Sequence, residues 1–495
     1  MSFNEVTELR KQGRLDEAEK LARKNLEQDV ENIWNRRSLA WVLETAIKKA
    51  NEQKNLEQVL IRMEQIAELA LPEEEDIFWN TLGWQIYFAL KTGESLPKDK
   101  QDGLCRQMFR LIRMMRWAKK TDGYRMLVKG FYSFRNIWPE FVAFCDWWGF
   151  EHLSPADYEM QIIRNEKVIS WAERLYIAYA KALLIKPDQE QISNFLPQIT
   201  TLHEQHPEMM YPRYFICKLM MANESNPNDV LAILLPFVRK KRKDFWTWQL
   251  LAELFVQDKD KQLACLLMAF YATRQLAFLG RVMEQLTEVL IHKEEYGAAR
   301  FVIEKYGAEK NKNQQSISTS MKGWMHTEWF ATNKPIPPCQ VMNYKELAMQ
   351  ILYSDMPKQA LIVTHVNVPK KMFSYIFGIR KKGYAKWDNI QNVQVGSMMQ
   401  AQWTEPQNEG GPHKLFTLRR ITETKNYDFC RRIKGRLKIN EIKKCAFLEA
   451  HQADVFIPKH LLPPDCCEGE HEVTAVFDFN TKKNDWSWRA IAFHQ

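Results

Sequence analysis

Two different spacings of apolar residues divide the chain into a helical part and a part built of strands. Over residues 1–310 the apolar positions recur three or four residues apart, as they do on one face of an α-helix. After residue 358 they alternate with polar positions in short runs, which is typical of half-buried strands. Residues 311–343 lose the helical spacing and include the proline-rich run 333–339, so we interpret them as a linker.

The first helical segment indicates how the predicted helices pack. One short helix is expected to end at Gly13, and the next, over residues 15–26, places leucines and the small residues Ala18 and Ala22 on a single face. This pattern resembles a tetratricopeptide repeat (TPR). Such a hairpin cannot bury its own apolar face, so it needs neighbouring hairpins. The resemblance predicts a right-handed TPR-like helical solenoid over residues 1–310, with a surface that holds a protein partner.

Ten candidate strands lie beyond the linker, five in residues 344–422 and five in residues 423–495. The first five are 360–367, 371–377, 383–387, 397–403 and 415–421, and the second five are 432–439, 443–448, 454–458, 472–479 and 486–491. Five short strands separated by turns suit a small OB-type β-barrel. A short helix at Tyr344–Leu352 is expected to lead into the first barrel. The predicted fold class is multidomain, α followed by β.

The second module resembles a cold-shock domain. Its second strand, Lys443-Lys444-Cys445-Ala446-Phe447-Leu448, and its third, Asp454-Val455-Phe456-Ile457-Pro458, are similar to the two binding strands of that family. The resemblance implies that Phe447 and Phe456 stack on bases while Lys443 and Lys444 contact phosphates, with His460 in the turn that follows. Cys445 stands where the family usually has an aromatic residue, so one stacking position is missing.

The first module is a looser copy of the same pattern. Its second and third predicted strands carry Phe373, Tyr375, Tyr384 and Trp387, and lysines that include Lys371 and Lys386 surround these rings. Aromatic residues interleaved with basic ones are expected in a groove that binds single-stranded nucleic acid. The alternative is that several of these rings form the core, because a small barrel needs large side chains inside.

A second group of basic residues lies in the helical part. Arg106, Arg110 and Arg113 recur at helical spacing, which places their guanidinium groups along one face of a helix. Such a face can follow a phosphate backbone. The alternative is an ordinary solvated face whose arginines pair with acidic neighbours.

The formal net charge of +9 comes mostly from the last third of the chain, where residues 341–495 hold 23 Lys and Arg against 16 Asp and Glu. A basic C-terminal third favours a polyanionic partner. The nine cysteines include no CxxC pair, the pair His203 and His206 lacks the HExxH spacing, and no nucleotide-binding glycine motif is present. We therefore expect no enzyme activity, no metal and no cofactor, and in the absence of an apolar membrane segment or signal peptide we expect a cytoplasmic protein.

A TPR-like array followed by cold-shock-like barrels resembles the accessory proteins of TOTE-type bacterial conflict systems, which are predicted defence loci. The resemblance implies a non-enzymatic adaptor in anti-phage defence. Its barrels would bind single-stranded RNA or DNA, with RNA favoured, and its repeats would hold an effector or another complex subunit. The alternative is a protein-interaction scaffold whose barrels do not bind nucleic acid.

Overall fold

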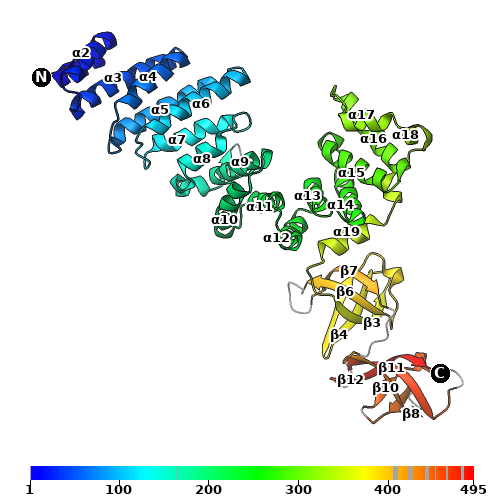
Figure 1. Cartoon of the computed structure of the whole chain (residues 1–495). Coiled ribbons are helices and arrows are strands. Elements are labelled where there is room, and N and C mark those ends of the chain that lie inside the picture. Colours follow the sequence, from blue (N-terminus) through cyan, green and yellow to red (C-terminus); the bar gives the residue numbers. More distant parts are fainter. Residues whose placement is uncertain are drawn as a thin grey trace. The chain divides into compact units, whose positions relative to one another are not determined.

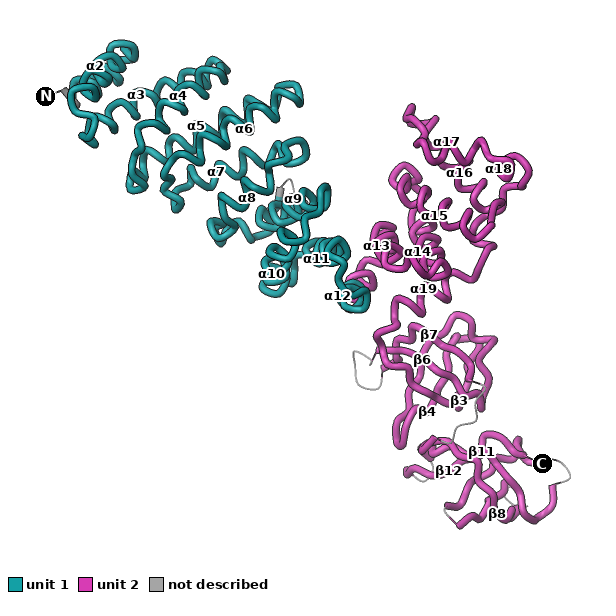
Figure 2. The backbone as a smooth tube through the Cα atoms, in the orientation of Figure 1, with its two compact units in different colours: residues 1–234 teal, residues 235–495 magenta. Residues whose placement is uncertain are grey.

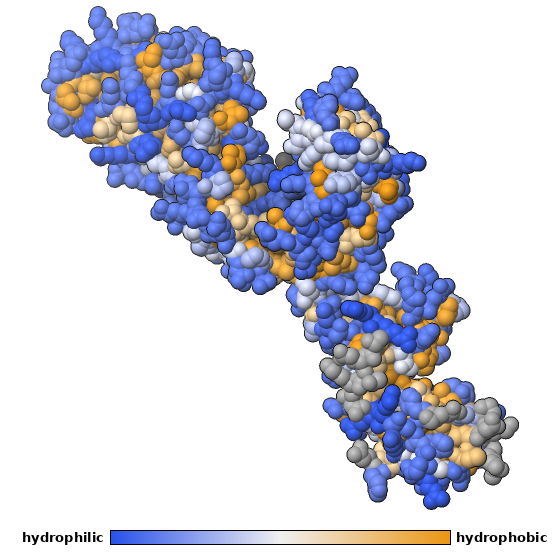
Figure 3. Space-filling model, turned by 45° about the vertical axis from the view of Figure 1, so that its right-hand side comes forward, coloured by the Kyte–Doolittle hydropathy of each residue, from blue (hydrophilic) through white to orange (hydrophobic). Residues whose placement is uncertain are grey.

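The computed structural model describes residues 2–163, 166–404, 411–421, 427–440, 445–451, 453–463, 466–480 and 484–494. The chain divides into two compact units, residues 1–234 and residues 235–495 (Figure 2). Hydrophilic residues cover most of the visible surface of each unit and are interrupted by smaller apolar patches (Figure 3). Within the described ranges, no helix combines the length and the apolar character needed to cross a membrane.

Unit 1 is almost entirely helical (Figure 1). Its helices are α1 Ser2–Lys11, α2 Leu15–Gln28, α3 Ile33–Glu52, α4 Leu56–Glu68, α5 Asp76–Gly93, α6 Lys98–Met114, α7 Asp122–Phe131, α8 Phe141–Trp148, α9 Trp171–Ile185, α10 Gln189–Gln205, α11 Tyr211–Ala222 and α12 Pro227–Lys240, the last of which crosses the boundary between the units. A two-stranded hairpin, β1 Gln161–Ile163 and β2 Glu166–Val168, interrupts the helices. The sequence pattern did not predict this hairpin.

The helices of unit 1 pack on their neighbours and on the next helix but one. Helix α1 contacts α2 and α3, and α3 contacts α4 and α5. The small residues Ala18 and Ala22 on α2 are fully buried, as the hairpin pattern predicted. Side chains cap several helix starts, and Asn32, for example, accepts a hydrogen bond from the Trp34 backbone at the start of α3. The predicted helical class is confirmed, while its assignment to the TPR family stays a prediction.

Helices α5 and α7 approach so closely that their backbones touch. A Cβ atom on Gly83 would overlap the backbone of Gly123, and one on Gly123 would overlap the backbone of Asn80. The Asn80 side chain also accepts a hydrogen bond of 2.8 Å from the Gly123 amide. This contact explains why glycine stands at two positions inside helices, where glycine is intrinsically unfavourable.

Replacement of Gly123 by alanine is therefore expected to lower the free energy of unfolding by roughly 1–3 kcal/mol, because backbone rather than a flexible side chain must move. Gly103→Ala is the matched control: it also lies inside a helix, α6, but nothing stands within 4 Å of its added Cβ. That variant should gain about 0.4–1 kcal/mol. Urea denaturation followed by far-ultraviolet circular dichroism measures both. Similar effects at the two positions would contradict the close α5–α7 contact.

Unit 2 begins with a second group of helices and ends in the strands (Figure 1). Its helices are α13 Phe245–Glu253, α14 Lys259–Tyr271, α15 Gly280–His292, α16 Tyr296–Lys312, α17 Thr319–Met325, α18 Glu328–Thr332 and α19 Tyr344–Leu352. Helix α19 spans the residues predicted for it. Helices α17 and α18 lie in the segment interpreted as a linker. That segment returns to α16, where Arg300 donates hydrogen bonds to the carbonyl groups of Ala331 and Asn333.

The first group of five strands is β3 Gln359–Asn367, β4 Met372–Gly378, β5 Lys381–Lys386, β6 Met398–Thr404 and β7 Lys414–Arg420. They form a sheet in the order β5-β4-β3-β6-β7, and a parallel bridge between Ala385 and His413 joins its two edge strands. The second group is β8 Cys430–Asn440, β9 Cys445–Glu449, β10 Val455–Ile457, β11 Glu470–Asn480 and β12 Asp485–His494, which close into a barrel. In both groups the third and fifth strands meet in parallel. The predicted pair of small five-stranded modules is confirmed.

The two strand modules pack against each other through a shared apolar cluster. Ile362 and Ile376 of the first module meet Phe429, Val476 and Ile491 of the second, and all five are buried. A cation also joins the two modules. The ammonium group of Lys382 in the first module lies 4.7 Å from the centre of the Phe479 ring in the second. A buried apolar contact of this kind holds the modules together as one body.

Candidate nucleic-acid interface

Strand β8 presents a row of basic side chains on the outside of the second barrel. Its residues alternate in burial, so that Leu437 points into the core while the residues on either side of it point outward. The outward positions are all basic and all exposed: Arg432, Lys434, Arg436 and Lys438. Because successive residues of a strand face opposite sides of the sheet, this spacing places four cations along one line.

Two aromatic rings lie beside this row. Lys438 is the cross-strand partner of Phe447 on β9, and Phe447 is the partner of Phe456 on β10. The two rings are half-buried, and their centroids are 5.6 Å apart at an angle of 58°. We call the group of Arg432, Lys434, Arg436, Lys438, Phe447 and Phe456 the β8 face. It combines cations for phosphates with rings on which bases can stack.

Two of the four cations of the β8 face form ion pairs with acidic residues that the structure describes, and the other two do not. Lys438 pairs with Glu449 at 2.6 Å, and Arg432 lies 3.9 Å from Glu472. Lys434 and Arg436 form no ion pair with any acidic residue that the structure describes. In the strand register Lys434 lies opposite Glu472, and Arg436 lies opposite Glu470 and Glu449, so acidic side chains border these two cations without an ion pair. Ion pairs at an exposed surface contribute little to stability, so exchanging Glu449 for a phosphate on Lys438 would also cost little.

The structure places the predicted residues of the second barrel as follows. Phe447 and Phe456 lie side by side on the outer face, where the resemblance predicted stacking rings. His460 is exposed in the short 3-10 helix Lys459–Leu461, which follows β10. Lys443 and Lys444 lie outside the described residues.

The first barrel places two predicted stacking rings in its core. Phe373 and Tyr375 are 1% and 0% exposed and belong to the central apolar cluster. The Tyr375 hydroxyl and His413 Nδ1 form a hydrogen bond of 2.5 Å inside the barrel. Alternation along β4 gave these rings a shared face, as predicted, but that face points inward. Neither ring is available to a base, which corrects their assignment as binding residues and agrees with the core alternative.

The other predicted residues of the first barrel lie at its surface. Tyr384 is half-buried and pairs across strands with Ser374, on the side opposite the core. Lys386 and Lys371 are exposed, and Lys371 lies 3.7 Å from Asp388. Trp387 packs partly against the core and lines a cavity described below. Only Tyr384 remains as an outward ring among those predicted here.

The arginines of α6 have partners within unit 1. Arg106 pairs with Asp102 at 3.1 Å and lies 3.6 Å from Glu140, while Arg110 pairs with Glu64 at 3.1 Å. The guanidinium group of the third, Arg113, lies 5.4 Å from the centre of a phenylalanine ring on its own helix. All three are exposed. These contacts are those of the solvated, ion-paired face that was the alternative.

Two features of the second barrel were not predicted, although a residue pattern in the sequence indicates each of them. The run Arg431-Arg-Ile-Lys-Gly-Arg-Leu-Lys438 alternates basic and apolar residues, which is the signature of the β8 row. The hairpin of β11 and β12 also brings together four half-buried rings, Phe477, Phe479, Trp486 and Trp488. Their spacing of two residues on each strand indicated this shared face.

The thiol at the start of β8 is buried. Burial raises the pKa of the Cys430 thiol to about 12, so this residue stays neutral at physiological pH. Across the ranges that the structure covers, no three His, Cys, Asp or Glu side chains gather where they would share a metal ion.

Comparison with known proteins assigns the two barrels. Residues 353–415 match S1/CSD-like domain 1 of the TOTE conflict systems, and residues 431–493 match S1/CSD-like domain 2 of the same systems. Residues 210–350 match a domain of unknown function, DUF7017. No curated protein matches the chain. The two matches fall on the two five-stranded modules in chain order, and S1/CSD-like domains suggest nucleic-acid binding. The C-terminal part of this chain is therefore a tandem pair of S1/CSD-like domains of the TOTE conflict systems, preceded by a mostly helical region.

Proposed function

We propose that this protein is a non-enzymatic adaptor that binds single-stranded nucleic acid through the β8 face. The observation that carries the proposal is the line of four outward cations beside the adjacent rings of Phe447 and Phe456. Single strands suit this surface because their bases are free to stack on side-chain rings, whereas the bases of a duplex are already stacked on each other. RNA is the favoured strand, and its binding would serve a defence response of the TOTE type.

The helical part would hold a protein partner. Support comes from α5, where the rings of Trp84, Tyr87 and Phe88 contact one another and Phe88 is 47% exposed. Large aromatic residues that remain accessible in such groups often anchor protein interfaces. The packed barrels and the helices would then connect a bound strand with an effector. The alternative, a scaffold without nucleic-acid binding, leaves the two unpaired cations of the β8 face without a role.

The proposal predicts a specific change in salt dependence. Titration of fluorescent single-stranded RNA and DNA with the full chain, followed by anisotropy over a salt series, gives the slope of log affinity against log salt. Lys434→Ala with Arg436→Ala removes two phosphate contacts, so the slope should become shallower by about 1.4, at about 0.7 for each contact with a single strand. Arg106→Ala with Arg110→Ala, on α6, is the matched control and should leave the slope unchanged.

Different outcomes separate the two functions. Binding with a steep salt slope that depends on Lys434 and Arg436 supports the proposal, and tighter binding of RNA than of DNA supports the preferred strand. If neither strand binds at low salt, the scaffold alternative replaces the proposal. If the α6 arginines rather than the β8 cations set the slope, the interface lies on the helices.

A further inference from the structure

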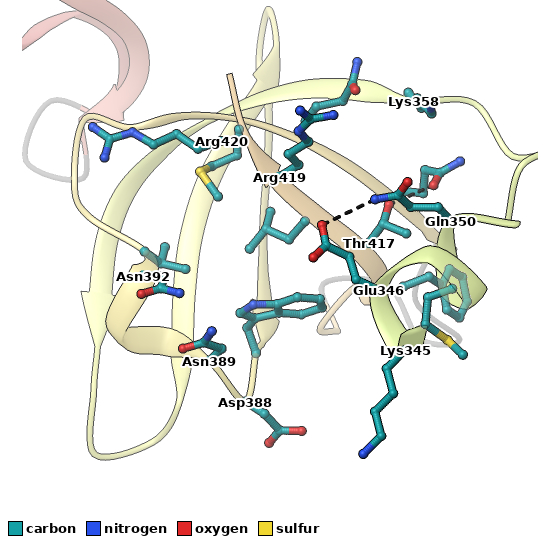
Figure 4. A pocket seen from close by; sticks show the side chains of 18 of the residues that line it. Lys345, Glu346, Gln350, Lys358, Asp388, Asn389, Asn392, Thr417, Arg419 and Arg420 are labelled. Carbon is teal, nitrogen blue, oxygen red and sulfur yellow. Dashed lines mark hydrogen bonds between the residues drawn. The ribbon is translucent and has the colours of Figure 1, made fainter. Parts of the chain in front are cut away.

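A large cavity lies on the first barrel, apart from the β8 face of the second. Its volume is about 1050 Å³, and it is bounded by α19, by the loop of residues 387–394 and by strands β6 and β7 (Figure 4). Cavities of a few hundred to about a thousand Å³ are typical of sites for small molecules and cofactors. The cavity joins the end of the DUF7017 match to the first S1/CSD-like domain.

The walls of the cavity are held in place by buried polar contacts. The Gln402 amide, 2% exposed, donates hydrogen bonds of 2.6 and 2.8 Å to the carbonyl groups of Tyr353 and Met356, just after α19. Thr417 on β7 donates to the oxygen of the same side chain at 2.8 Å. The Phe416 ring stacks on Tyr353 with centroids 4.0 Å apart. These contacts fix α19 on the sheet, so the cavity is preformed.

The acidic side chains that line the cavity have polar partners, whereas basic side chains that line it form no ion pair with the residues that the structure describes. Glu346 accepts hydrogen bonds from Asn343 and Gln350, and Asp388 lies 3.7 Å from Lys371. By contrast, three cations at the cavity, Lys358, Arg419 and Arg420, have no ion-pair partner among the residues that the structure describes. Figure 4 shows Arg419 and Lys358 toward the same side of the cavity, across from Lys345 and Asp388, whereas Arg420, the next residue of β7, extends in the opposite direction from Arg419. The side of the cavity that holds Arg419 and Lys358 suits an anion, and arginine in particular suits phosphate oxygens.

The remaining lining supplies an aromatic ring and amides. The indole of Trp387 is half-buried and lines the cavity, as do the amide side chains of Gln350, Asn392 and Gln400. An aromatic face can stack on a base, and amides can donate to and accept from its edge. Phosphate-binding cations, a ring and amides within one preformed cavity are the parts of a nucleotide site.

We propose that this cavity binds a nucleotide, with its phosphate at Arg419 and Lys358 and its base against Trp387. The ligand is either a free nucleotide or the phosphorylated terminal nucleotide of a strand, because both offer the same chemistry. The site is independent of the β8 face. It would make the first S1/CSD-like domain a sensor of a phosphorylated ligand while the second binds the strand.

The test uses the full chain and a fluorescent N-methylanthraniloyl derivative of ATP, titrated by anisotropy. Unlabelled ATP, AMP and adenosine compete, as do short RNA oligonucleotides with a 5′-phosphate or a 5′-hydroxyl. We expect binding that ATP and AMP displace and adenosine does not, together with a loss of at least about tenfold in affinity for Arg419→Ala. Arg420→Ala, on the opposite face of β7, is the matched control and should keep most of the affinity. Lys358→Ala, which lies outside the strands, is the second variant should Arg419→Ala prevent folding.

The β8 variant Lys434→Ala with Arg436→Ala separates this proposal from the proposed function. It should keep nucleotide binding and weaken strand binding, whereas Arg419→Ala should weaken nucleotide binding and keep binding of a strand without a 5′-phosphate. Competition by the 5′-phosphorylated oligonucleotide alone would identify the strand terminus as the ligand. Absence of nucleotide and 5′-phosphate binding at millimolar concentration, or binding unchanged by both Arg419→Ala and Lys358→Ala, would overturn the proposal.

Discussion

Removal of both rings of the β8 face, by Phe447→Ala together with Phe456→Ala, is expected to weaken binding of single-stranded RNA by roughly 2–6 kcal/mol. Each base stacked on an aromatic side chain contributes about 1–3 kcal/mol, and the two rings lie side by side with centroids 5.6 Å apart. The smaller figure already corresponds to a loss of about 30-fold in Kd. Anisotropy titration at one fixed salt concentration measures it.

The slope against salt should stay the same in this double variant, because no cation has been removed. That feature distinguishes lost stacking from lost phosphate contacts. Phe447→Tyr with Phe456→Tyr is the matched control, since tyrosine keeps a ring at each position and should keep most of the affinity. Equal affinity of the alanine variant and the unchanged protein would show that bases do not stack on this surface.

Alternation along a strand shows which residues share a face, but it does not show which face is the core. In β9 the outward set holds Phe447, and in β4 the corresponding aromatic set, Phe373 and Tyr375, points inward. The sequence around β4 offers rings on one face and Ser374 on the other, so either face could have been taken for the core. Packing against β3, β6 and the loop around Ile390 decides the question, and these contacts are not local in the sequence.

The arginines of α6 also show what residue spacing cannot predict. Helical spacing placed Arg106 and Arg110 on one exposed face, which the structure confirms. Arg106 has one partner four residues away on α6, Asp102, but the other partners, Glu140 and Glu64, come from residues far along the chain in other parts of unit 1. Only tertiary structure brings such acids to the helix, so spacing alone could not distinguish a phosphate-binding face from an ion-paired one.

The fold class could be predicted from the sequence more readily than the sites, because it depends on local periodicity. Helical spacing in the first part and alternation in the last part each repeat over many residues, and turns between the strands limited the alternatives to small barrels. The cavity beneath α19 depends instead on contacts between Gln402 and the chain near Tyr353, which are distant in sequence. No local pattern marks such a contact.

Phe373→Ala is expected to lower the free energy of unfolding of the barrels by about 3–5 kcal/mol, the usual range for removal of a buried phenylalanine. The ring is 1% exposed and lies 5.4 Å from the Tyr375 ring in the core of the first barrel. Because the barrels share an apolar contact through Ile376, the second barrel should lose part of its stability as well. Urea denaturation followed by near-ultraviolet circular dichroism reports this loss.

Two further variants test whether the loss of stability comes from the burial of the Phe373 ring. Tyr384→Ala removes an outward ring from the neighbouring strand and should cost no more than about 1 kcal/mol. Phe373→Leu keeps most of the buried volume and should cost less than about 1.5 kcal/mol. If Phe373→Ala instead left stability unchanged and reduced RNA affinity, the ring would be a binding residue, as its sequence first predicted. A loss of stability with unchanged affinity of the folded protein at low temperature would confirm that Phe373 belongs to the core.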